Sequence, residues 1–249
     1  MKDNENLYDK IRELIGKEPG NLNIMEDHID VDLQAEYFEY SKKVSRQFDE
    51  SWAIDQIEML FDPDFPNDAK KQLLARLATS SDVKAYRAIE SYASEPDNGL
   101  RDWGLLALQE SRMHLESHLL EENQVFISTG LGGRDHKLRY FVVLISRGRK
   151  SLNEFQVKIV GKEFPYVLGK YDGEVEEFDA SGYLAAFMLL LPIQHAVKDV
   201  FTEGINECNQ YGDFLRENCI VTNVKRLTFG EVVEFIEKKS DHNETPPAT

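Results

Sequence analysis

Cysteine and long apolar segments are scarce in this sequence. The 249 residues include two cysteines, Cys208 and Cys219, which are too few for a disulfide-stabilised scaffold. The apolar run at residues 184–191 is far shorter than the about 20 residues needed to cross a bilayer, so membrane insertion is not expected. The chain begins MKDNENLYDK, which lacks the apolar stretch of a secretory signal. Together these absences predict a cytoplasmic protein.

Basic residues are also in the minority. The sequence contains 29 Lys and Arg against 45 Asp and Glu, for a net charge of −16. Because nucleic-acid phosphates and anionic membranes are bound by clustered Lys and Arg, general nucleic-acid binding is not expected. The charge favours a basic protein partner, with an affinity that falls as ionic strength rises. The hydrophobic content of 41% is enough for buried cores and excludes a wholly disordered chain.

The negative charge is concentrated in the first half of the chain. Residues 1–123 contain 14 basic and 27 acidic residues, a net charge of −13, whereas residues 124–249 contain 15 and 18, a net charge of −3. The hydrophobic periodicity changes at the same place. We therefore predict a helical domain over residues 1–122, an α+β domain over residues 123–239 and a disordered tail over residues 240–249.

Apolar residues of the first half recur at helical spacing. This spacing predicts helices over residues 7–15, 33–48, 52–61, 69–77, 82–93 and 100–120. Pro-rich or Gly-rich turns separate several of them, as in the Asp62-Pro63-Asp64 and Pro96-Asp97-Asn98-Gly99 segments. The first half is therefore expected to be all-helical.

A weak internal repeat is present in these helices. The shared pattern is Ile57-Glu58 followed by Pro63-Asp64 in one unit and Ile89-Glu90 followed by Pro96-Asp97 in the next, at offsets of 32 and 33 residues. Each unit consists of a helix, a Pro/Asp turn and a leucine-rich helix. Residues 51–119 therefore resemble HEAT-type helical hairpins, although the period is shorter than the usual 40 or so residues. The resemblance implies a surface that holds a partner; an ordinary helical bundle is the alternative.

The second half mixes strand and helix patterns. Strands are predicted over residues 124–128, 137–146, 155–160, 166–170, 174–178 and 220–224, with a hairpin turn at Asp172-Gly173. Residues 184–191 are predicted to form a buried helix, followed by a second helix after Pro192. A capping-box pattern from Thr228 to Glu231 predicts one more. The expected fold is α+β with a mostly antiparallel sheet.

A row of metal-ligating side chains lies on the last predicted helix of the first half. Its members, four residues apart and therefore on one face, are Glu110, His114, His118 and Glu122. Imidazoles at i and i+4 can chelate Zn²⁺, with a carboxylate as third ligand. Leu105, Leu108 and Leu115 define the opposite side, so the row is expected to point away from the helical core. A metal-dependent enzyme with a site at the domain interface is one alternative function; a solvated polar face is the simpler interpretation.

A glycine-rich loop is the second candidate site. It contains Gly130, Gly132, Gly133 and Arg134, whose backbone N–H groups and guanidinium could bind a phosphate. Phosphate loops usually lead into a helix, whereas the next segment here has the composition of a strand, and no GK[ST] sequence is present. A small-molecule or phosphate-binding protein is thus a second alternative, and a hairpin connection is the favoured interpretation.

The remaining chemistry-bearing residues give no catalytic pattern. A basic cluster of Arg134, Lys137, Arg139, Arg147, Arg149 and Lys150 is divided between the two ends of a predicted strand about 33 Å long, so it cannot bind one small anion. Cys208 lies on an apolar helical stripe and is expected to be inert. No cofactor is predicted. The favoured function is a protein–protein interaction or scaffold module.

Overall fold

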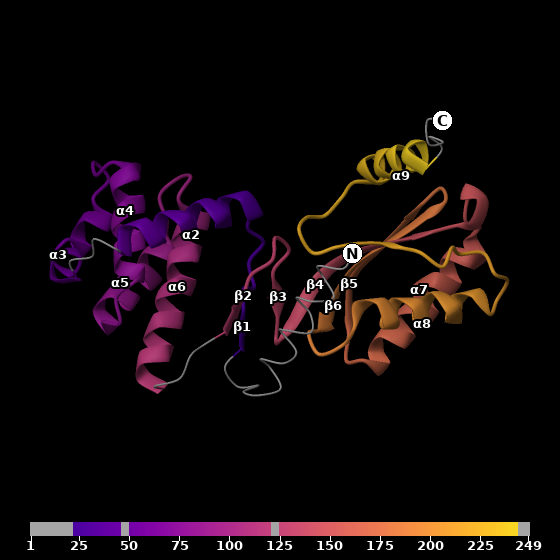
Figure 1. Ribbon diagram of the computed structural model, residues 1–249, viewed down its shortest axis with the longest axis horizontal. Helices are drawn as coiled ribbons and strands as arrows, with labels where there is room; N and C mark the ends of the chain where they lie inside the picture. Colours follow the sequence, from indigo (N-terminus) through magenta and orange to yellow (C-terminus); the bar gives the residue numbers. More distant parts are fainter. Residues whose placement is uncertain (1–21, 46–49, 121–124, 244–249) are drawn as a thin grey trace, which may run out of the picture. The chain divides into compact units, whose positions relative to one another are not determined.

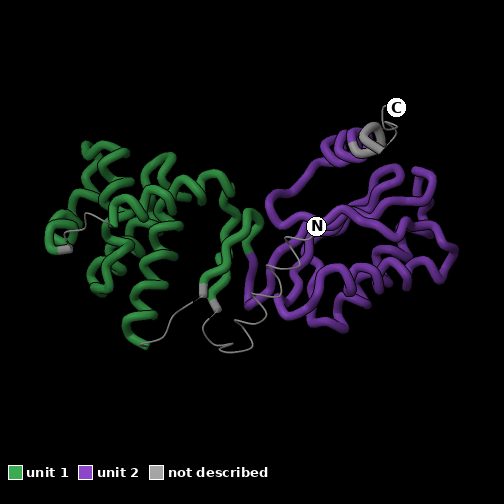
Figure 2. Tube along the Cα trace, viewed as in Figure 1, with its two compact units in different colours: residues 1–132 green, residues 133–249 purple. Residues whose placement is uncertain are grey.

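The computed structural model describes residues 22–45, 50–120 and 125–243 (Figure 1). The chain divides into two compact units, residues 1–132 and residues 133–249, called unit 1 and unit 2 below (Figure 2). The sequence places the boundary at residues 122/123. The division lies after Gly132 because the segment that follows α6 forms a strand within unit 1.

Unit 1 is built from helices that pack around one core. They are α2 (Val31–Ser45), α3 (Glu50–Asp55), the 3₁₀ helix η2 (Ile57–Phe61), α4 (Asn67–Ala78), α5 (Val83–Ser94) and α6 (Arg101–Leu120). α2, α4, α5 and α6 each correspond to a helix predicted from the periodicity, and the single helix predicted at residues 52–61 is divided into α3 and η2. The helix predicted at residues 7–15 lies outside the described residues. The core contains Tyr37, Leu74, Ile89, Trp103 and Leu106. Burial of these one-sided apolar stripes is what stabilises the helices.

A short parallel sheet accompanies the helices of unit 1. Strand β1 (Leu22–Ile24) pairs with β2 (Val125–Ile127), so segments about a hundred residues apart in sequence lie side by side. β2 confirms the strand predicted at residues 124–128, whereas β1 was not predicted. Three residues are too few for an alternating pattern to be recognised.

A partly buried ion pair joins α4 to the turn before α6. The Lys70 side chain is only 2% exposed, and its Nζ lies 2.5 Å from Asp97 Oδ2. Tyr92 Oη donates a hydrogen bond to the same oxygen at 2.8 Å. Asp97 belongs to the Pro96-Asp97 turn of the repeat-like pattern, so this turn is held by a contact between a buried ammonium group and a carboxylate that is 36% exposed.

Unit 2 is an antiparallel sheet with helices. Its elements are β3 (Gly133–Arg134), β4 (Lys137–Ile145), the 3₁₀ helix η3 (Arg147–Arg149), α7 (Glu154–Lys170), β5 (Glu174–Ser181), β6 (Leu184–Pro192), α8 (Val197–Asn209), β7 (Ile220–Thr222) and α9 (Phe229–Asn243). From β4 to β7 the order is β-α-β-β-α-β, and the strands lie in the order β7-β4-β6-β5, all antiparallel to their neighbours. This is the ferredoxin-like arrangement, and the predicted α+β class is confirmed.

Helices α7 and α8 cover the same face of this sheet (Figure 1). Phe164 of α7 and Phe201 of α8 pack against Phe187 and the other inward side chains of β4 and β6. The Phe164 and Phe187 rings are stacked, with centroids 4.8 Å apart. Within the part of the chain that the structure describes, no helix is both long enough and apolar enough to cross a membrane.

Two predicted strands are wrong, because residues 155–160 and 166–170 both belong to α7. A capping box starts this helix: Asn153 Oδ1 accepts from Gln156 N at 2.9 Å, and Asn153 N donates to Gln156 Oε1 at 3.0 Å. Six alternating residues also fit a helix whose buried side is Ile159, Val160 and Phe164. Asp172-Gly173 accordingly ends α7 and leads into β5, with Asp172 at φ +55°, instead of joining two strands.

The buried helix predicted at residues 184–191 is also wrong, because this segment is strand β6. All nine residues of β6 are buried, since the strand lies between β4 and β5 with both faces covered. A continuous apolar run is equally compatible with a buried helix and a central strand. The capping box predicted for the last helix is confirmed: Glu231 N donates to Thr228 Oγ1 at 3.2 Å, and Thr228 N donates to Glu231 Oε2 at 2.8 Å. α9 continues to Asn243, and residues 244–249 of the predicted tail lie outside the described residues.

Candidate functional site

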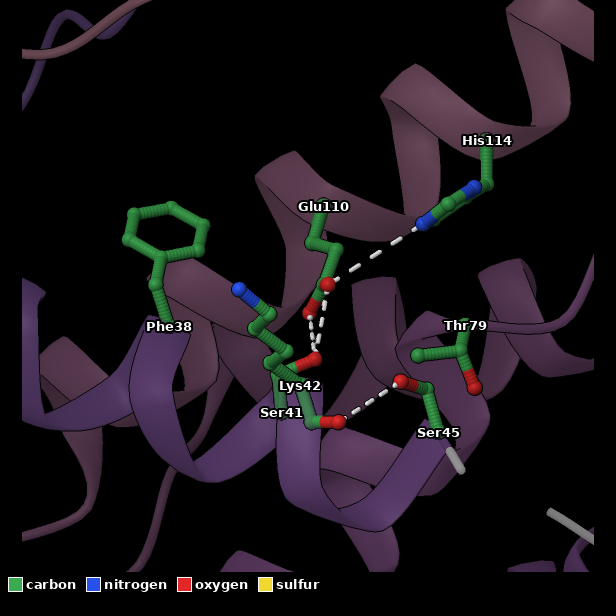
Figure 3. A pocket seen from close by; sticks show the side chains of 7 residues that line it. All are labelled: Phe38, Ser41, Lys42, Ser45, Thr79, Glu110 and His114. Carbon is green, nitrogen blue, oxygen red and sulfur yellow. Dashed lines mark hydrogen bonds and ion pairs between the residues drawn. The ribbon is translucent and has the colours of Figure 1, made fainter. Parts of the chain in front are cut away.

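A cavity of about 370 Å³ opens within unit 1, between α2, α6 and the C-terminal end of α4 (Figure 3). It is lined by Phe38, Ser41, Lys42, Ser45, Thr79, Glu110 and His114. The four residues from α2 recur at helical spacing, so they form one face of that helix. The lining combines an aromatic ring, three hydroxyl groups, an ammonium group, a carboxylate and an imidazole.

The Glu110 carboxylate is a largely enclosed polar group of this cavity. Its side chain is 10% exposed. Ser41 Oγ lies 2.7 and 2.8 Å from its two oxygens, and Tyr37 Oη donates to Oε2 at 2.6 Å. Burial, together with the negative charge of Glu110, raises the pKa of Tyr37 well above its ordinary value, so Tyr37 remains a protonated donor. Two neutral donors thus hold the Glu110 carboxyl group in a nearly buried position.

His114 lies one turn further along α6 and faces the same carboxylate. Its Nε2 is 3.9 Å from Glu110 Oε1, and its side chain is 42% exposed (Figure 3). The other ring edge therefore has access to solvent. The arrangement can orient the imidazole, and a bound molecule could contact it together with Lys42.

The expected orientation of the Glu110–Glu122 row is wrong at its first member. Glu110 points toward α2 and the helical core instead of away from it, because Tyr37 and Ser41 supply hydrogen-bond donors there. His118 is exposed, and Glu122 lies outside the described residues. Across the described residues, no group of three or more His, Cys, Asp or Glu side chains is placed to hold a metal ion.

The sequence did not identify the α2 side of the cavity. Ser41 lies on the stripe of α2 that also carries Tyr37 and is 1% exposed. A serine on an otherwise apolar stripe needs a buried hydrogen-bond partner. The position of Ser41 on that stripe was therefore the one sequence signal for a polar site beside α2. Its partner is 69 residues away in sequence, so spacing could not reveal which residue it is.

The glycine loop packs closely against another segment of unit 1. Gly132 has φ +66°, and a Cβ added there would lie 2.5 Å from the Glu26 carbonyl oxygen and 2.7 Å from that of Asp27. Gly130 and Gly133 are buried as well. Carbonyl oxygens repel a phosphate, so the backbone around Gly132 is arranged for close packing and not for an anion. The loop leads into the β3–β4 hairpin, whose two turn residues Asp135 and His136 have positive φ, as in a type I′ turn.

The basic cluster at the start of β4 is paired with the acidic strand β5. Lys137 Nζ lies 2.5 Å from Glu174 Oε1, and Arg134 also donates to Glu174, at 2.9 Å. Arg139 makes two hydrogen bonds to Glu176, at 2.6 and 2.9 Å. Strands β4 and β5 flank β6 and are thus about 9.6 Å apart, a distance that a long basic side chain and a glutamate can span together.

These contacts shift the pKa values of both partners. The hydrogen bond with Glu174 raises the pKa of Lys137, and the same contact lowers the pKa of Glu174. At the other end of β4, Arg147 Nη2 lies 2.9 Å from Asp213 Oδ1. The basic cluster predicted from the sequence thus makes ion pairs at both ends of β4. Arg134, the candidate phosphate ligand, contacts Glu174 and Asp135 of unit 2.

The acidic residues of unit 1 are mostly exposed. Among the described residues of this unit, the exposed acidic side chains without an ion pair are Glu26, Asp30, Asp32, Glu36, Glu39, Asp55, Glu58, Asp64, Asp68 and Glu95. Asp32, Glu36 and Glu39 follow one outward stripe of α2. These carboxylates make the described surface of unit 1 acidic.

Neither thiol is set up as a nucleophile. Cys208 is buried, as predicted, and burial raises its pKa to about 12. Burial likewise raises the pKa of Cys219 to about 11. Both remain protonated near neutral pH and are weak nucleophiles.

Comparisons with known proteins leave the family of this chain open. No family model and no curated protein matches the sequence. Among solved structures, the chain is similar to a crystal structure named "putative transposase" from Deinococcus radiodurans R1, with 15% sequence identity and a TM-score of 0.36. The similarity covers 43% of this chain and 94% of that one. A similarity at this level carries no argument about fold or function.

Proposed function

We propose that unit 1 is an interaction module that binds a basic protein partner through its exposed carboxylates. The observation that supports this is a contrast between the units. Among the described residues, unit 1 leaves ten acidic side chains exposed without ion pairs, whereas unit 2 leaves four, Glu154, Asp179, Asp199 and Glu237. Unit 2 pairs Glu174, Glu176 and Glu177 of its acidic strand with its own Lys and Arg. The resemblance of residues 51–119 to HEAT-type hairpins is consistent with such a role. A scaffold role requires no catalytic group, and none of the candidate nucleophiles is activated.

An exposed anionic surface mainly raises the association rate with a basic partner and the specificity for it. It attracts a basic partner over roughly one Debye length, about 8 Å at physiological ionic strength. Individual exposed ion pairs contribute about 0–1 kcal/mol each, so several must act together for measurable affinity. The binding should therefore weaken strongly with salt.

A charge-matched pair of variants tests this function. The first carries Asp32→Asn, Glu36→Gln and Glu39→Gln on α2; the control carries Asp179→Asn, Glu234→Gln and Glu237→Gln, which removes the same charge from unit 2. Proteins captured from native lysate at low and high salt are identified by mass spectrometry. We expect basic proteins to be recovered with the wild type and the control at low salt, and lost at high salt or with the α2 variant. Recovery of no protein at low salt, or equal loss with both variants, contradicts the proposal.

The cavity beside Glu110 favours a second candidate function, the binding of a small polar ligand. Its volume of about 370 Å³ is in the range of ligand sites, and Lys42 and His114 line it beside a nearly buried carboxylate. A thermal-shift screen with nucleotides, phosphorylated metabolites and amino acids tests this, because a ligand that binds the folded state raises Tm. A ligand whose shift survives Glu110→Gln and Lys42→Ala does not bind here.

The metal-dependent alternative has a separate test. Glu110 and His114 could provide two ligands. The remaining ligands would have to come from residues that do not line the cavity. Elemental analysis of protein purified without an affinity tag should detect stoichiometric zinc, iron or manganese if this alternative holds. The metal should then be lost in the His114→Ala/His118→Ala variant.

A further inference from the structure

The outward face of α7 carries exposed aromatic and basic side chains. Phe155, Lys158, Lys162 and Tyr166 recur at spacings of three and four residues, so they form one stripe, called the α7 face below. Phe155 is 64% exposed and Tyr166 is 62% exposed. The opposite side of the helix, which includes Phe164 and Leu168, packs on the sheet. The α7 face is thus free of the core of its own unit.

This combination is typical of a binding surface. Exposed large aromatic residues are enriched at protein interfaces, where they bury much surface with few rotatable bonds. Lys158 has no ion pair among the described residues, and Lys162 has a single contact, 3.9 Å from Glu163. The face therefore presents positive charge between two aromatic rings and fits an acidic helix.

The chain itself contains such a helix. Asp32, Glu36, Glu39 and Lys43 lie along one stripe of α2, called the α2 face below, and all four are exposed without ion pairs among the described residues. Their spacings are four, three and four residues, and in both faces the first and last members are eleven residues apart. At 1.5 Å per residue each stripe is about 17 Å long.

Read in opposite directions, the two faces complement each other at every position. The pairs are Asp32 with Tyr166, Glu36 with Lys162, Glu39 with Lys158 and Lys43 with Phe155. The numbers of each pair add to 197 or 198, so one antiparallel register aligns all four to within one residue. The pairs comprise a hydrogen bond to a carboxylate, two ion pairs and a cation–π contact.

We infer that the α7 face binds the α2 face of a second copy of this chain, with the two helices antiparallel. A parallel register would also set glutamates opposite lysines, but it would place Asp32 against the Phe155 ring, and it would align the helix dipoles unfavourably. A two-fold dimer contains the contact twice, because each copy contributes both faces. The inference rests on the proposed function of unit 1 as an acidic binding module and gives it a partner.

Complementary charge reversals test the contact in the full-length chain. Glu36→Lys alone places two lysines opposite each other, and Lys162→Glu alone places two glutamates opposite each other, in both halves of the dimer. We expect the wild type to dimerise at low salt in sedimentation velocity experiments. Each single variant should raise the dimer Kd about tenfold or more. Because all these residues are exposed, the variants should fold normally; Lys84→Glu on the exposed side of α5 is the matched control and should dimerise like the wild type.

Mixing the two single variants gives the decisive result. In a mixed dimer the lysine introduced at position 36 of one copy meets the glutamate introduced at position 162 of the other, and the second contact retains its native glutamate and lysine. Near wild-type affinity in the mixture, and in the Glu36→Lys/Lys162→Glu double variant, supports the inference. A monomeric wild type at low salt overturns it, and so does restoration in the double variant without restoration in the mixture, which indicates a contact within one chain. If Lys158→Glu restores the dimer affinity of the Glu36→Lys variant and Lys162→Glu does not, the antiparallel register is overturned.

The outcomes also separate this inference from the proposed function. If the wild type is monomeric but the lysate experiment recovers basic proteins that depend on α2, the inference fails and the proposed function stands. If the chain dimerises through these faces but recovers no other protein, the interaction-module proposal for foreign partners fails and the dimer stands.

Discussion

Units 1 and 2 use their acidic residues in different ways. In unit 2 the carboxylates of β5 reach across β6 to Lys137 and Arg139 of β4 and to Arg134 of β3, with distances of 2.5 to 2.9 Å. In unit 1 the acidic stripe of α2 faces solvent, and the best-buried ion pair there, Lys70 with Asp97, lies elsewhere in the helical core. Similar residue types are therefore paired within the fold on β5 and exposed without ion pairs among the described residues on α2.

The difference follows from the geometry of the elements. In a sheet, alternate residues of neighbouring strands share a face, so long charged side chains can meet over a central strand. On an outward helical stripe, neighbours three and four residues apart belong to the same helix, and α2 places acids at these positions. Stability and binding are thus expected to respond to different carboxylates, and the following variants test that separation.

The largest effect is expected for Asp97→Ala in unit 1. Removal of this carboxylate leaves the 2% exposed Lys70 ammonium without its counter-charge and Tyr92 Oη without its acceptor. We expect a loss of about 2–4 kcal/mol in the free energy of unfolding, measured by urea denaturation. Asp64→Ala, at the corresponding turn of the repeat-like pattern, is the control and should change stability by less than about 0.5 kcal/mol, because Asp64 is exposed without an ion pair. Equal effects of the two substitutions would contradict this account.

A smaller effect is expected for Glu174→Gln in unit 2. The substitution removes one of two carboxylates beside Lys137, since Asp172 remains 3.3 Å from its Nζ. Because the Glu174 side chain is 48% exposed, the loss should be about 0.5–1 kcal/mol. Contact with Lys137 lowers the pKa of Glu174 in the folded state. The advantage of the wild type should therefore be complete above the unfolded pKa of about 4.3, and should be lost as pH falls through the lower folded pKa. Denaturation curves at pH 7 and at successively lower pH values measure this; an advantage that grows on acidification contradicts it.

The helices of unit 1 could be predicted because their apolar residues repeat on a single face. The same reasoning failed for β6, since a strand buried on both faces has no alternation, and for the start of α7, where six residues fit either period. The pairing of β1 with β2 depends on segments about a hundred residues apart, which no local pattern encodes.

The candidate site could be predicted only in part. The spacing of Glu110 and His114 correctly placed both residues along one side of α6, one turn apart. It could not show that Ser41 and Tyr37 of α2 would turn Glu110 inward, because that depends on how two helices pack. The pairing of the basic cluster with β5 was missed for a similar reason: it requires knowing that β6 lies between β4 and β5.

The smallest effect is expected for the variant that neutralises Asp32, Glu36 and Glu39 on α2. These side chains are exposed without ion pairs among the described residues, so their removal leaves no partner unsatisfied. Loss of a favourable helix-dipole interaction at Asp32 is offset by relief of repulsion between Glu36 and Glu39, three residues apart. We expect unfolding free energies within about 0.5 kcal/mol of the wild type, by the same urea titration, although the variant loses its partner in the capture experiment. A destabilisation as large as that of Glu174→Gln would mean that α2 uses its carboxylates as β5 does, for the fold, and would remove the distinction between the two units.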